Sequence, residues 1–313
     1  MRIYFWGVRG SLPAPLLPSQ IKSKISSIIE RLTPEDLASQ EDRERFLAGL
    51  PPWLFGAVGG NTPCVTVRAE HCPEILVFDA GSGIREMGIA MGKENPKPSK
   101  YHLFFSHFHW DHIQGLPFFG PAYDPSVSVD FYSPMAALEE VLRNQMCPPC
   151  FPARLETMGS KKEFHLLNGP VQFSGLAISY KRMNHPGGCY SYLINDGKHR
   201  LIYATDTSLT ADDFSKNKEN SSFFKGADLI IIDCQYTLGE AIEKYGWGHN
   251  AFSLAADFSA NWNIKHMVLF HHDPTYGDHK LYNMLQSARW YLERMNIRGI
   301  ELTLATEGLE IKL

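Results

Sequence analysis

The sequence lacks a hydrophobic run long enough to cross a membrane. No uncharged stretch among the 313 residues approaches the roughly 20 residues that a bilayer-spanning helix needs. The opening segment, MRIYFWGVRGSLPAP, contains no continuous apolar stretch of signal-peptide length. We therefore expect a cytoplasmic protein that does not contact a membrane.

Cysteine is scarce and dispersed along the chain. The six cysteines show no dense disulfide pattern, so most are expected to be buried thiols. Cys147 and Cys150 flank two prolines, and this CxxC could be half of a metal knuckle or a redox pair. A second CxxC that would complete a four-thiolate zinc site is missing. Two prolines in a loop account for the spacing, which favours a structural role.

The chain also lacks an excess of positive charge. Its 30 Lys and Arg residues are outnumbered by 34 Asp and Glu residues, which gives a formal net charge of −4. A broad electrostatic footprint for a long nucleic acid is therefore not expected, although a local basic groove could lie within that total. A small anionic substrate fits this charge better.

Strand-like and helix-like patterns alternate along the sequence, which predicts a layered α/β protein with its chemistry on loops at one sheet edge. Apolar or alternating runs predict strands at residues 1–10, 64–67, 75–78, 103–105, 176–180, 191–194, 201–204, 229–232 and 266–270. Helical periodicity predicts helices at residues 135–144, 251–261 and 280–295. The run 216–220 is expected to be a solvated loop.

A charged, helical pattern interrupts the first part of the chain. It covers residues from about 19 to 53, with Thr33 and Pro34 placed as a helix start. Because 313 residues with 44% hydrophobic content suit one large core, we expect a single domain over residues 1–313 with a helical insertion at about 19–53.

Four potential metal ligands crowd into six residues directly after the predicted strand at 103–105. They are His107, His109, Asp111 and His112, in the pattern His-x-His-x-Asp-His. Their side chains can converge if the loop is extended and then turns into a helix. Imidazole and carboxylate together suit zinc, manganese or iron rather than calcium. Histidines that only cap a helix or lie on a surface are the alternative, but this pattern is highly specific.

This motif resembles the hallmark of the metallo-β-lactamase superfamily, and the loop at 79–83, DAGSG, resembles the loop that precedes it there. The resemblance extends over nearly the whole chain and implies a four-layer αββα sandwich of two mixed sheets. It implies two divalent metal ions, zinc or manganese with iron as a further candidate. The implied ligands are His107, His109 and His185 for one metal, Asp111, His112 and His271 for the other, and Asp206 as the bridge.

His272 competes with its neighbour His271 as the last ligand. Alternate residues of an extended chain point to opposite sides, and His271 follows the predicted strand immediately. This position favours His271.

The implied ligand set favours phosphodiester hydrolysis, since two metals about 3.5 to 4 Å apart can share a hydroxide and clamp both oxygens of an in-line displacement. Asp206 stands where β-lactam hydrolases of the superfamily have a cysteine, which argues against antibiotic hydrolysis. His109 stands where di-iron redox relatives carry Glu, which argues against reduction of oxygen or nitric oxide.

The C-terminal part resembles the phosphodiesterase branch of the superfamily, which includes tRNA 3′-end endonucleases and bacterial cyclic-nucleotide phosphodiesterases. Asp233 and His249 stand where the tRNA enzymes place a carboxylate and the histidine that protonates the leaving oxygen. A departing alkoxide needs a proton, and a carboxylate can orient and raise the pKa of the imidazole that delivers it. Alternatively, His249 only caps a helix and Asp233 is a solvated strand end. With Asp111, these two residues form the predicted catalytic set.

The sequence departs from the tRNA endonucleases in two ways. Asp233-Cys234-Gln235 replaces their His-Glu-Ala-Thr pattern, and a basic, glycine-rich arm for tRNA is not recognisable. The segments 6–11, 59–64 and 270–274 are instead similar to bacterial cyclic-nucleotide phosphodiesterase-like proteins. Arg9 and Asn61 could contact a phosphate or shape the loops, and the aromatic segment at 118–123 could stack a nucleobase or pack in the core.

The predicted function is therefore two-metal hydrolysis of a phosphodiester, a cyclic nucleotide or another small one, by a metal-bridging hydroxide. Thioester or lactone hydrolysis uses the same nucleophile and is the second enzymatic hypothesis. A metal-binding or nucleotide-sensing module is the non-enzymatic one. A homodimer is a further possibility.

Overall fold

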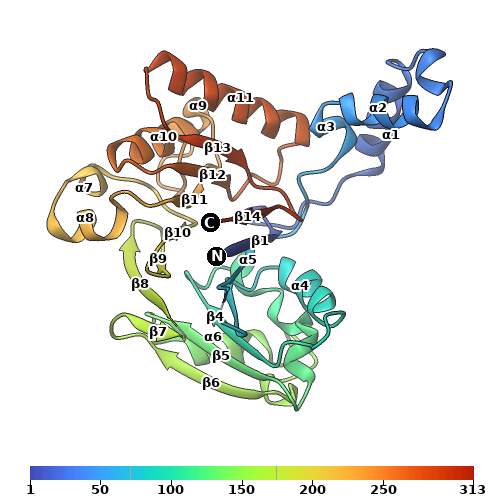
Figure 1. Cartoon of the computed structure of the whole chain (residues 1–313). Helices are drawn as coiled ribbons and strands as arrows, with labels where there is room; N and C mark the ends of the chain where they lie inside the picture. The colour runs from blue at the N-terminus through green and yellow to red at the C-terminus, as the bar shows by residue number, and fades with distance from the viewer. Residues whose placement is uncertain (71, 174) are drawn as a thin grey trace.

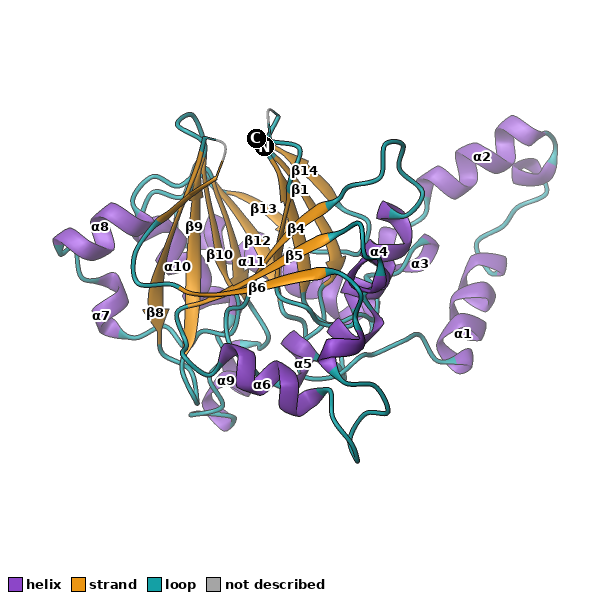
Figure 2. Ribbon diagram, turned by 90° about the horizontal axis from the view of Figure 1, so that it is seen from below, coloured by secondary structure: helices purple, strands orange, loops and turns teal. Residues whose placement is uncertain are grey.

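The computed structural model describes residues 1–70, 72–173 and 175–313, which form two mixed β-sheets packed face to face with helices on the outside (Figures 1 and 2). The first sheet has the order β14-β1-β2-β3-β4-β5-β6, with β14 at Glu310–Lys312, β1 at Arg2–Gly7, β2 at Cys64–Arg68, β3 at Ile75–Phe78, β4 at Lys100–Phe104, β5 at Ser128–Ser133 and β6 at Lys161–Leu166. The predicted αββα sandwich is confirmed.

The second sheet has the order β13-β12-β11-β10-β9-β8-β7. Its strands are β13 at Glu301–Leu304, β12 at His266–Phe270, β11 at Leu229–Asp233, β10 at Arg200–Ala204, β9 at Cys189–Asn195, β8 at Leu176–Met183 and β7 at Val171–Phe173. Strands β10 to β13 are parallel, whereas β7, β8, β9 and β10 pair antiparallel. The β3 to β6 half of the first sheet is parallel as well.

Helices cover the outer face of each sheet and form an arm at one side (Figure 2). The helices of the body are α4 at Gly83–Met91, α5 at Trp110–Ile113, α6 at Leu138–Gln145, α7 at Ala211–Phe214, α8 at Lys218–Phe224, α9 at Leu238–Glu243, α10 at Phe252–Asn261 and α11 at Asp278–Arg294. Residues 18–55 contain α1 at Pro18–Ile29, a 3₁₀ turn at Glu35–Leu37, α2 at Gln40–Gly49 and α3 at Pro52–Phe55. Within the described residues, no helix is both long and apolar enough to span a bilayer.

Alternation along the strands builds the core in two layers. On β3, Leu76 and Phe78 face the space between the sheets, while Ile75 and Val77 face the helices α4 to α6. Phe78 stacks on Phe104 with ring centroids 5.4 Å apart. Since both faces of such strands are buried, their sequences are continuous apolar runs, which is why they were predictable.

One predicted loop is a helix. The run 216–220 is not a solvated loop throughout, because α8 begins at Lys218. The side chain of Asn217 accepts a hydrogen bond from the backbone N–H of Asn220 and so caps the first turn. The charged composition of this run concealed the helix start.

Candidate metal centre

The chain leaves three strands, one of the first sheet and two of the second, in a left-handed backbone conformation at one edge of the sandwich. Asp79 after β3, Asp206 after β10 and His271 after β12 have φ values of 60°, 45° and 59°. Residues other than glycine rarely adopt positive φ values, because the conformation is strained. Such a strained backbone persists only where the surrounding structure fixes it. The sharp turns aim these side chains across the edge toward the segment between β4 and α5, which carries His107 to His112.

The first ligand group consists of His107, His109, His185 and Asp206, which each offer one donor atom within 4.8 Å of the others. The Nε2 atoms of His107 and His185 lie 3.6 and 3.8 Å from Oδ2 of Asp206. His185 Nε2 lies 3.1 Å from Nδ1 of His109. These residues come from both sheets, so the group forms only in the folded chain.

The second group consists of Asp111, His112, Asp206 and His271, again with donor atoms within 4.8 Å of one another. Nε2 of His112 and Nε2 of His271 each lie 3.1 Å from Oδ1 of Asp206. His271 Nε2 is also 3.2 Å from Oδ2 of Asp111. Asp206 therefore presents one carboxylate oxygen to each group.

The protonation of these side chains suits a metal pair. Burial, together with neighbouring imidazoles, holds the pKa of His107 well below its usual value, so its ring is neutral. His107 Nε2 is buried and finds no hydrogen-bond partner among residues 1–70, 72–173 and 175–313. Burial opposes ionisation of Asp206, but His112 and His271 hold its pKa well below the usual range. Neutral imidazole and ionised carboxylate are the forms that bind metals.

His112 differs from the other imidazoles because carboxylates surround it. Burial lowers its pKa, yet Asp206, Asp111 and Asp79 together raise it well above the usual value. A divalent cation would take the place of that proton among the same carboxylates. The buried His and Asp cluster therefore fits a binuclear metal site, and its donor set is the one that zinc prefers.

Asp79 orients the ligands, a role that the sequence did not reveal. Its carboxylate accepts hydrogen bonds from the hydroxyl groups of Ser106 at 2.7 Å and Tyr203 at 2.8 Å. It also accepts the Nδ1–H of His112 at 2.8 Å, which leaves Nε2 of that ring for the second group. Its position after a buried strand and before a glycine loop was the available signal.

Backbone groups orient other donors. His185 Nδ1–H donates to the carbonyl of Gly248 at 3.0 Å. The backbone N–H of Ser11 donates to Oδ2 of Asp111 at 2.8 Å. At Gly10 a Cβ would lie 2.4 Å from Cε1 of His271, so only glycine allows this close approach.

His271 and His272 point to different surroundings. His271 belongs to the second group, and its Nδ1–H donates to the side-chain carbonyl of Gln235 at 3.2 Å. His272 Nε2–H donates to the carbonyl of Ala305 at 2.9 Å, and burial lowers its pKa to about 3. The structure thus brings His271, not its neighbour, to the cluster.

Asp233 and His249 form a buried pair beside the cluster. Oδ2 of Asp233 lies 2.6 Å from Nδ1 of His249, and Asp233 is fully buried, so it is not a solvated strand end. The His249 ring lies 5.0 Å from that of His271 and 5.4 Å from that of His185. Burial lowers the pKa of His249, but Asp233 more than offsets this and raises it. Helix α10 begins after Ala251, which removes the capping interpretation.

Arg9 and Asn61 support the loops from behind. Arg9 as a whole residue is 2% exposed, and its guanidinium lies 3.6 Å from the carboxylate of Asp278. Asn61 donates to Glu307 at 3.1 Å and accepts from Ser82 at 2.9 Å. Both side chains are therefore occupied within the protein rather than directed at a substrate phosphate.

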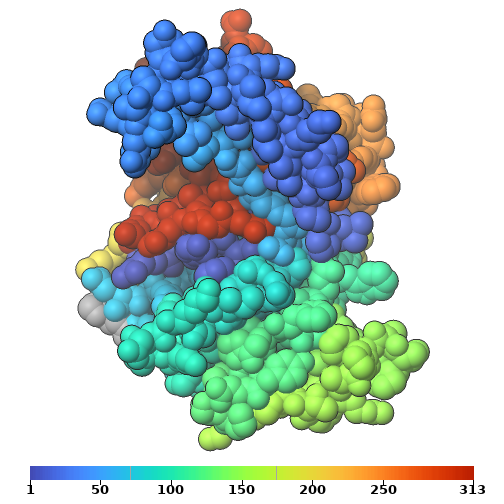
Figure 3. Space-filling model, turned by 90° about the vertical axis from the view of Figure 1, so that its right-hand side faces the viewer, coloured from blue at the N-terminus to red at the C-terminus, as the bar shows by residue number. Residues whose placement is uncertain are grey.

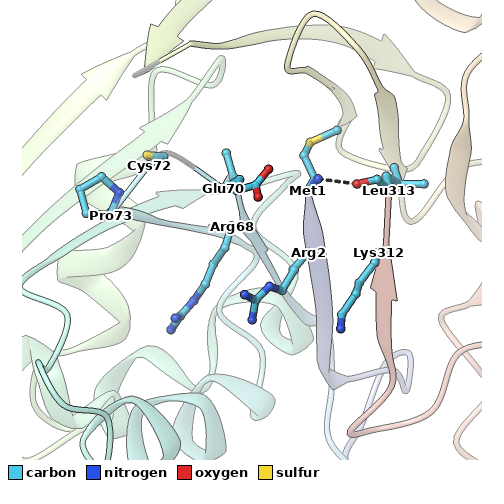
Figure 4. A pocket seen from close by; sticks show the side chains of 9 residues that line it. Met1, Arg2, Arg68, Glu70, Cys72, Pro73, Lys312 and Leu313 are labelled. Carbon is cyan, nitrogen blue, oxygen red and sulfur yellow. Dashed lines mark hydrogen bonds between the residues drawn. The ribbon is translucent and has the colours of Figure 1, made fainter.

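A separate hollow of about 400 Å³ lies at the end of strands β1, β2 and β14 that is far from the metal cluster (Figure 4). Arg2 begins β1, pairs with Lys312 at the end of β14 and with Arg68 at the end of β2, and these three side chains share one side of the sheet. The chain termini close this end through a hydrogen bond from the amino group of Met1 to the carbonyl of Leu313 at 2.7 Å. Its position separates it from the metal cluster.

Comparisons with known proteins agree with this architecture. Residues 75–272 match the family described as "Beta-lactamase superfamily domain". A ribonuclease Z of Prochlorococcus marinus (strain NATL1A) is 22% identical over 271 residues, covering 69% of this chain and 83% of that protein.

Two solved structures share the fold over the whole chain. A diphosphatase of the PhnP family has a TM-score of 0.64 at 17% identity, covering 100% of this chain and 97% of that one. The Zn²⁺-bound PqqB of Methylobacterium extorquens has a TM-score of 0.66 at 16% identity, covering 100% of both chains. Since the matched family segment includes all seven residues of the His and Asp cluster and the strands that carry them, the chain belongs to the metallo-β-lactamase superfamily and is a metal-dependent hydrolase.

Proposed function

We propose that the chain is a phosphodiesterase that hydrolyses a cyclic nucleotide or another small phosphodiester. The observation that carries this proposal is the Asp233 and His249 pair, which lies against the ligand group of His271. A two-metal site alone serves many hydrolases, whereas a buried, carboxylate-paired imidazole beside it serves a leaving group that needs a proton.

The proposed metal ligands are the two groups that share Asp206, with zinc or manganese as the cations. When bound, such a pair supplies an activated water and neutralises charge on the phosphoryl oxygens. The residues are His107, His109 and His185 on one side, and Asp111, His112 and His271 on the other.

His249 is the proposed proton donor. Its Nδ1–H is held by Asp233, which leaves Nε2 for a leaving oxygen and favours the protonated ring. Asp233 itself stays in place through the backbone N–H groups of Gln235 and Thr207, at 3.1 and 3.3 Å. An alkoxide leaving group requires such a donor, while a thiolate has less need of one.

The proposed place for an aromatic group of the substrate is a cavity whose wall is formed partly by the metal-binding segment. The cavity has a volume of about 550 Å³, within the range of small-ligand sites. Its walls include Phe108, Trp110, Gln114, Phe118, Asn144 and Phe151. Trp110 lies between His109 and Asp111 in the chain and is 81% exposed. Aromatic faces with nearby amides suit a nucleobase, which stacks on one and hydrogen-bonds to the other. Phe119 of the predicted aromatic segment is instead buried in the core.

The comparisons support the same bond class, since a ribonuclease and a diphosphatase both cleave bonds to phosphorus. The sequence shows no recognisable basic, glycine-rich arm of the kind that binds tRNA, and we therefore propose a small phosphodiester rather than tRNA as the substrate.

The test is a substrate panel with zinc- or manganese-reconstituted protein. We expect turnover of bis(p-nitrophenyl) phosphate and of 3′,5′-cyclic AMP or GMP, and a higher KM for the cyclic nucleotides in Trp110→Ala. Trp290→Ala is the matched control, because Trp290 is 58% exposed on the distant helix α11. Hydrolysis of thioesters or lactones without any phosphodiester turnover would replace this proposal with the carbonyl-ester alternative.

A further inference from the structure

Helix α1 presents its apolar side to solvent. Leu17, Ile21, Ile25 and Ile29 recur every fourth residue and therefore form one row along the helix. Their exposed fractions are 57, 46, 52 and 61%. A surface helix of a monomer has the opposite orientation, with its apolar row on the core.

The side of α1 that faces the body is mostly polar. Lys24 Nζ lies 2.5 Å from Oδ2 of Asp278 and donates to the carbonyl of Gly56 at 2.6 Å. Gln20, Lys24 and Ile28, each one turn apart, are partly buried, while Ile21, Ile25 and Ile29 beside them are exposed. The helix is thus attached mainly through charge and hydrogen bonds, with Ile28 as its one partly buried isoleucine, and the row of Leu17, Ile21, Ile25 and Ile29 remains outside.

The arm formed by residues 18–49 projects from the body (Figures 1 and 3). All residues of α1 and α2 are exposed or half-exposed in the single chain. Helices of 12 and 10 residues are of a length that is marginal in water without a covered apolar face. An exposed apolar row of this kind marks an interaction surface.

We propose that a second copy of this chain covers the row, so that the protein is a two-fold symmetric dimer held by its arms. A two-fold axis brings the same surface of both copies together. Residues four apart form ridges, and the ridges of two identical helices interdigitate in the commonest mode of helix packing. The row can therefore be its own partner.

The charges of the arm favour the same arrangement. Lys24 is neutralised by Asp278 within the chain, which leaves Lys22 and Arg31 against Glu30 in residues 17–31, whereas residues 33–49 contain five acidic residues and two basic ones. In an antiparallel pair, the basic α1 of one copy lies against the acidic α2 of the other. This complementarity fixes the register and disfavours a parallel arrangement.

The row supplies the apolar part of a standard dimer interface. At on the order of 100 Å² of apolar area for each of its four side chains, one copy offers about 400 Å² of the ~800 Å² that each partner buries. Interfaces of this kind are only a little more than half apolar, so polar contacts between α1 and α2 of the two copies supply the remainder.

Sedimentation equilibrium of the full chain across micromolar concentrations tests the proposal. We expect the mass of a dimer for the wild type and of a monomer for Ile21→Asp/Ile25→Asp. Ile89→Asp is the matched control, since Ile89 is 43% exposed on α4, outside the arm, and it should leave the dimer intact. Circular dichroism would verify that each variant remains folded.

Lys22→Glu provides a second variant that keeps the isoleucine row, and it should raise the dimer dissociation constant at low salt and less so at high salt. A monomeric wild type at every concentration would overturn the proposal, as would a dimer that survives both arm variants. A monomer that co-sediments with lipid vesicles would assign the row to a membrane surface and overturn it too. Oligomeric mass is the readout, and not activity, because the segment just before the arm contains Ser11, whose backbone N–H donates to Asp111. A change in the arm could therefore alter activity through the metal centre as well as through dimerisation.

Discussion

At the scale of single residues, Asp206 connects the two ligand groups. Its Oδ1 lies 3.1 Å from His112 and His271, while its Oδ2 faces His107 and His185. A carboxylate in this position would neutralise part of the charge of two bound cations. Residues that are not ligands themselves hold the ligands in position through hydrogen bonds. Asp79 is the main one, because it accepts hydrogen bonds from His112, Ser106 and Tyr203.

Asp79→Asn should lower metal affinity without removing a ligand. Oδ2 of Asp79 accepts from the side chains of Ser106, Tyr203 and His112, and its Oδ1 accepts from the backbone N–H of Ser106. An amide accepts through its oxygen only, so in Asp79→Asn one of these two sets faces an NH₂ group and loses its acceptor. We expect a loss of about 10- to 100-fold in metal affinity, measured by competition with a chromophoric chelator. Asp213→Asn is the control, because Asp213 is also buried but accepts its hydrogen bond from Thr210, away from the cluster. Equal affinities in Asp79→Asn and wild type would remove Asp79 from the site.

His249→Gln should reduce turnover and retain metal. Loss of a positioned proton donor lowers the rate by about 10²- to 10⁴-fold on a substrate with an alkyl leaving group, and by less on a p-nitrophenyl ester. Metal content and both rates are the measurements. His199→Gln is matched to it, since His199 also pairs with a carboxylate, Asp196, at 3.4 Å. An unchanged rate on the alkyl substrate would refute the proton-donor role.

Residue patterns in the sequence predicted the ligands of the cluster, but they did not predict the residues that hold these ligands in place. The structure brings together all seven residues that the resemblance nominated as ligands, because the local motif fixes four of them and strand ends carry the rest. The support from Gly248, Gln235 and Ser11 could not be predicted. These contacts depend on the register of loops that are 63, 36 and 100 residues away from their partners.

At the scale of elements, strands that are apolar runs were predicted, whereas strands with polar residues in them were missed, including the buried strand β5, whose sequence is SVDFYS. Strands β3, β10, β11 and β12 are continuous apolar runs. Strands β6, β13 and β14 carry exposed polar side chains, and β14 is three residues long. Pairing with a neighbour, rather than local sequence, makes them strands.

Helix α9 lies between Asp233 and His249 and is held by Glu240. Glu240 accepts hydrogen bonds from Thr237, Tyr276 and Lys280. Burial opposes its ionisation, but these donors lower its pKa from 4.5 to about 2. A carboxyl group with a depressed pKa in the folded state stabilises that state above its unfolded pKa, and the contribution is lost as pH falls through the folded pKa.

Glu240→Gln should therefore be less stable than the wild type above pH 4.5, and the difference should shrink as pH falls toward 2. Urea midpoints across this range are the measurement. Glu243→Gln, on the same helix, is the control and should show no such trend. A stability difference that is constant with pH would mean that ionisation of Glu240 does not anchor α9.

At the scale of the whole molecule, the candidate centre joins the two sheets. His107 to His112 follow the first sheet, whereas His185, Asp206 and His271 follow strands of the second. Bound cations would thus link the halves of the sandwich and stabilise the folded chain in proportion to their occupancy.

Chelation should accordingly lower the melting temperature by about 3 to 8 °C, and added zinc should restore it. Differential scanning calorimetry with and without EDTA measures this shift. Asp206→Ala should melt at the same temperature under both conditions. An equal response of Asp206→Ala and wild type would place the stabilising cation elsewhere.

The most direct test of a two-metal centre is anomalous diffraction from crystals of the zinc-reconstituted protein, with data on both sides of the zinc edge. We expect two anomalous peaks, one on each side of the Asp206 carboxylate, with His107, His109 and His185 around one and Asp111, His112 and His271 around the other. A single peak, or peaks away from Asp206, would contradict it.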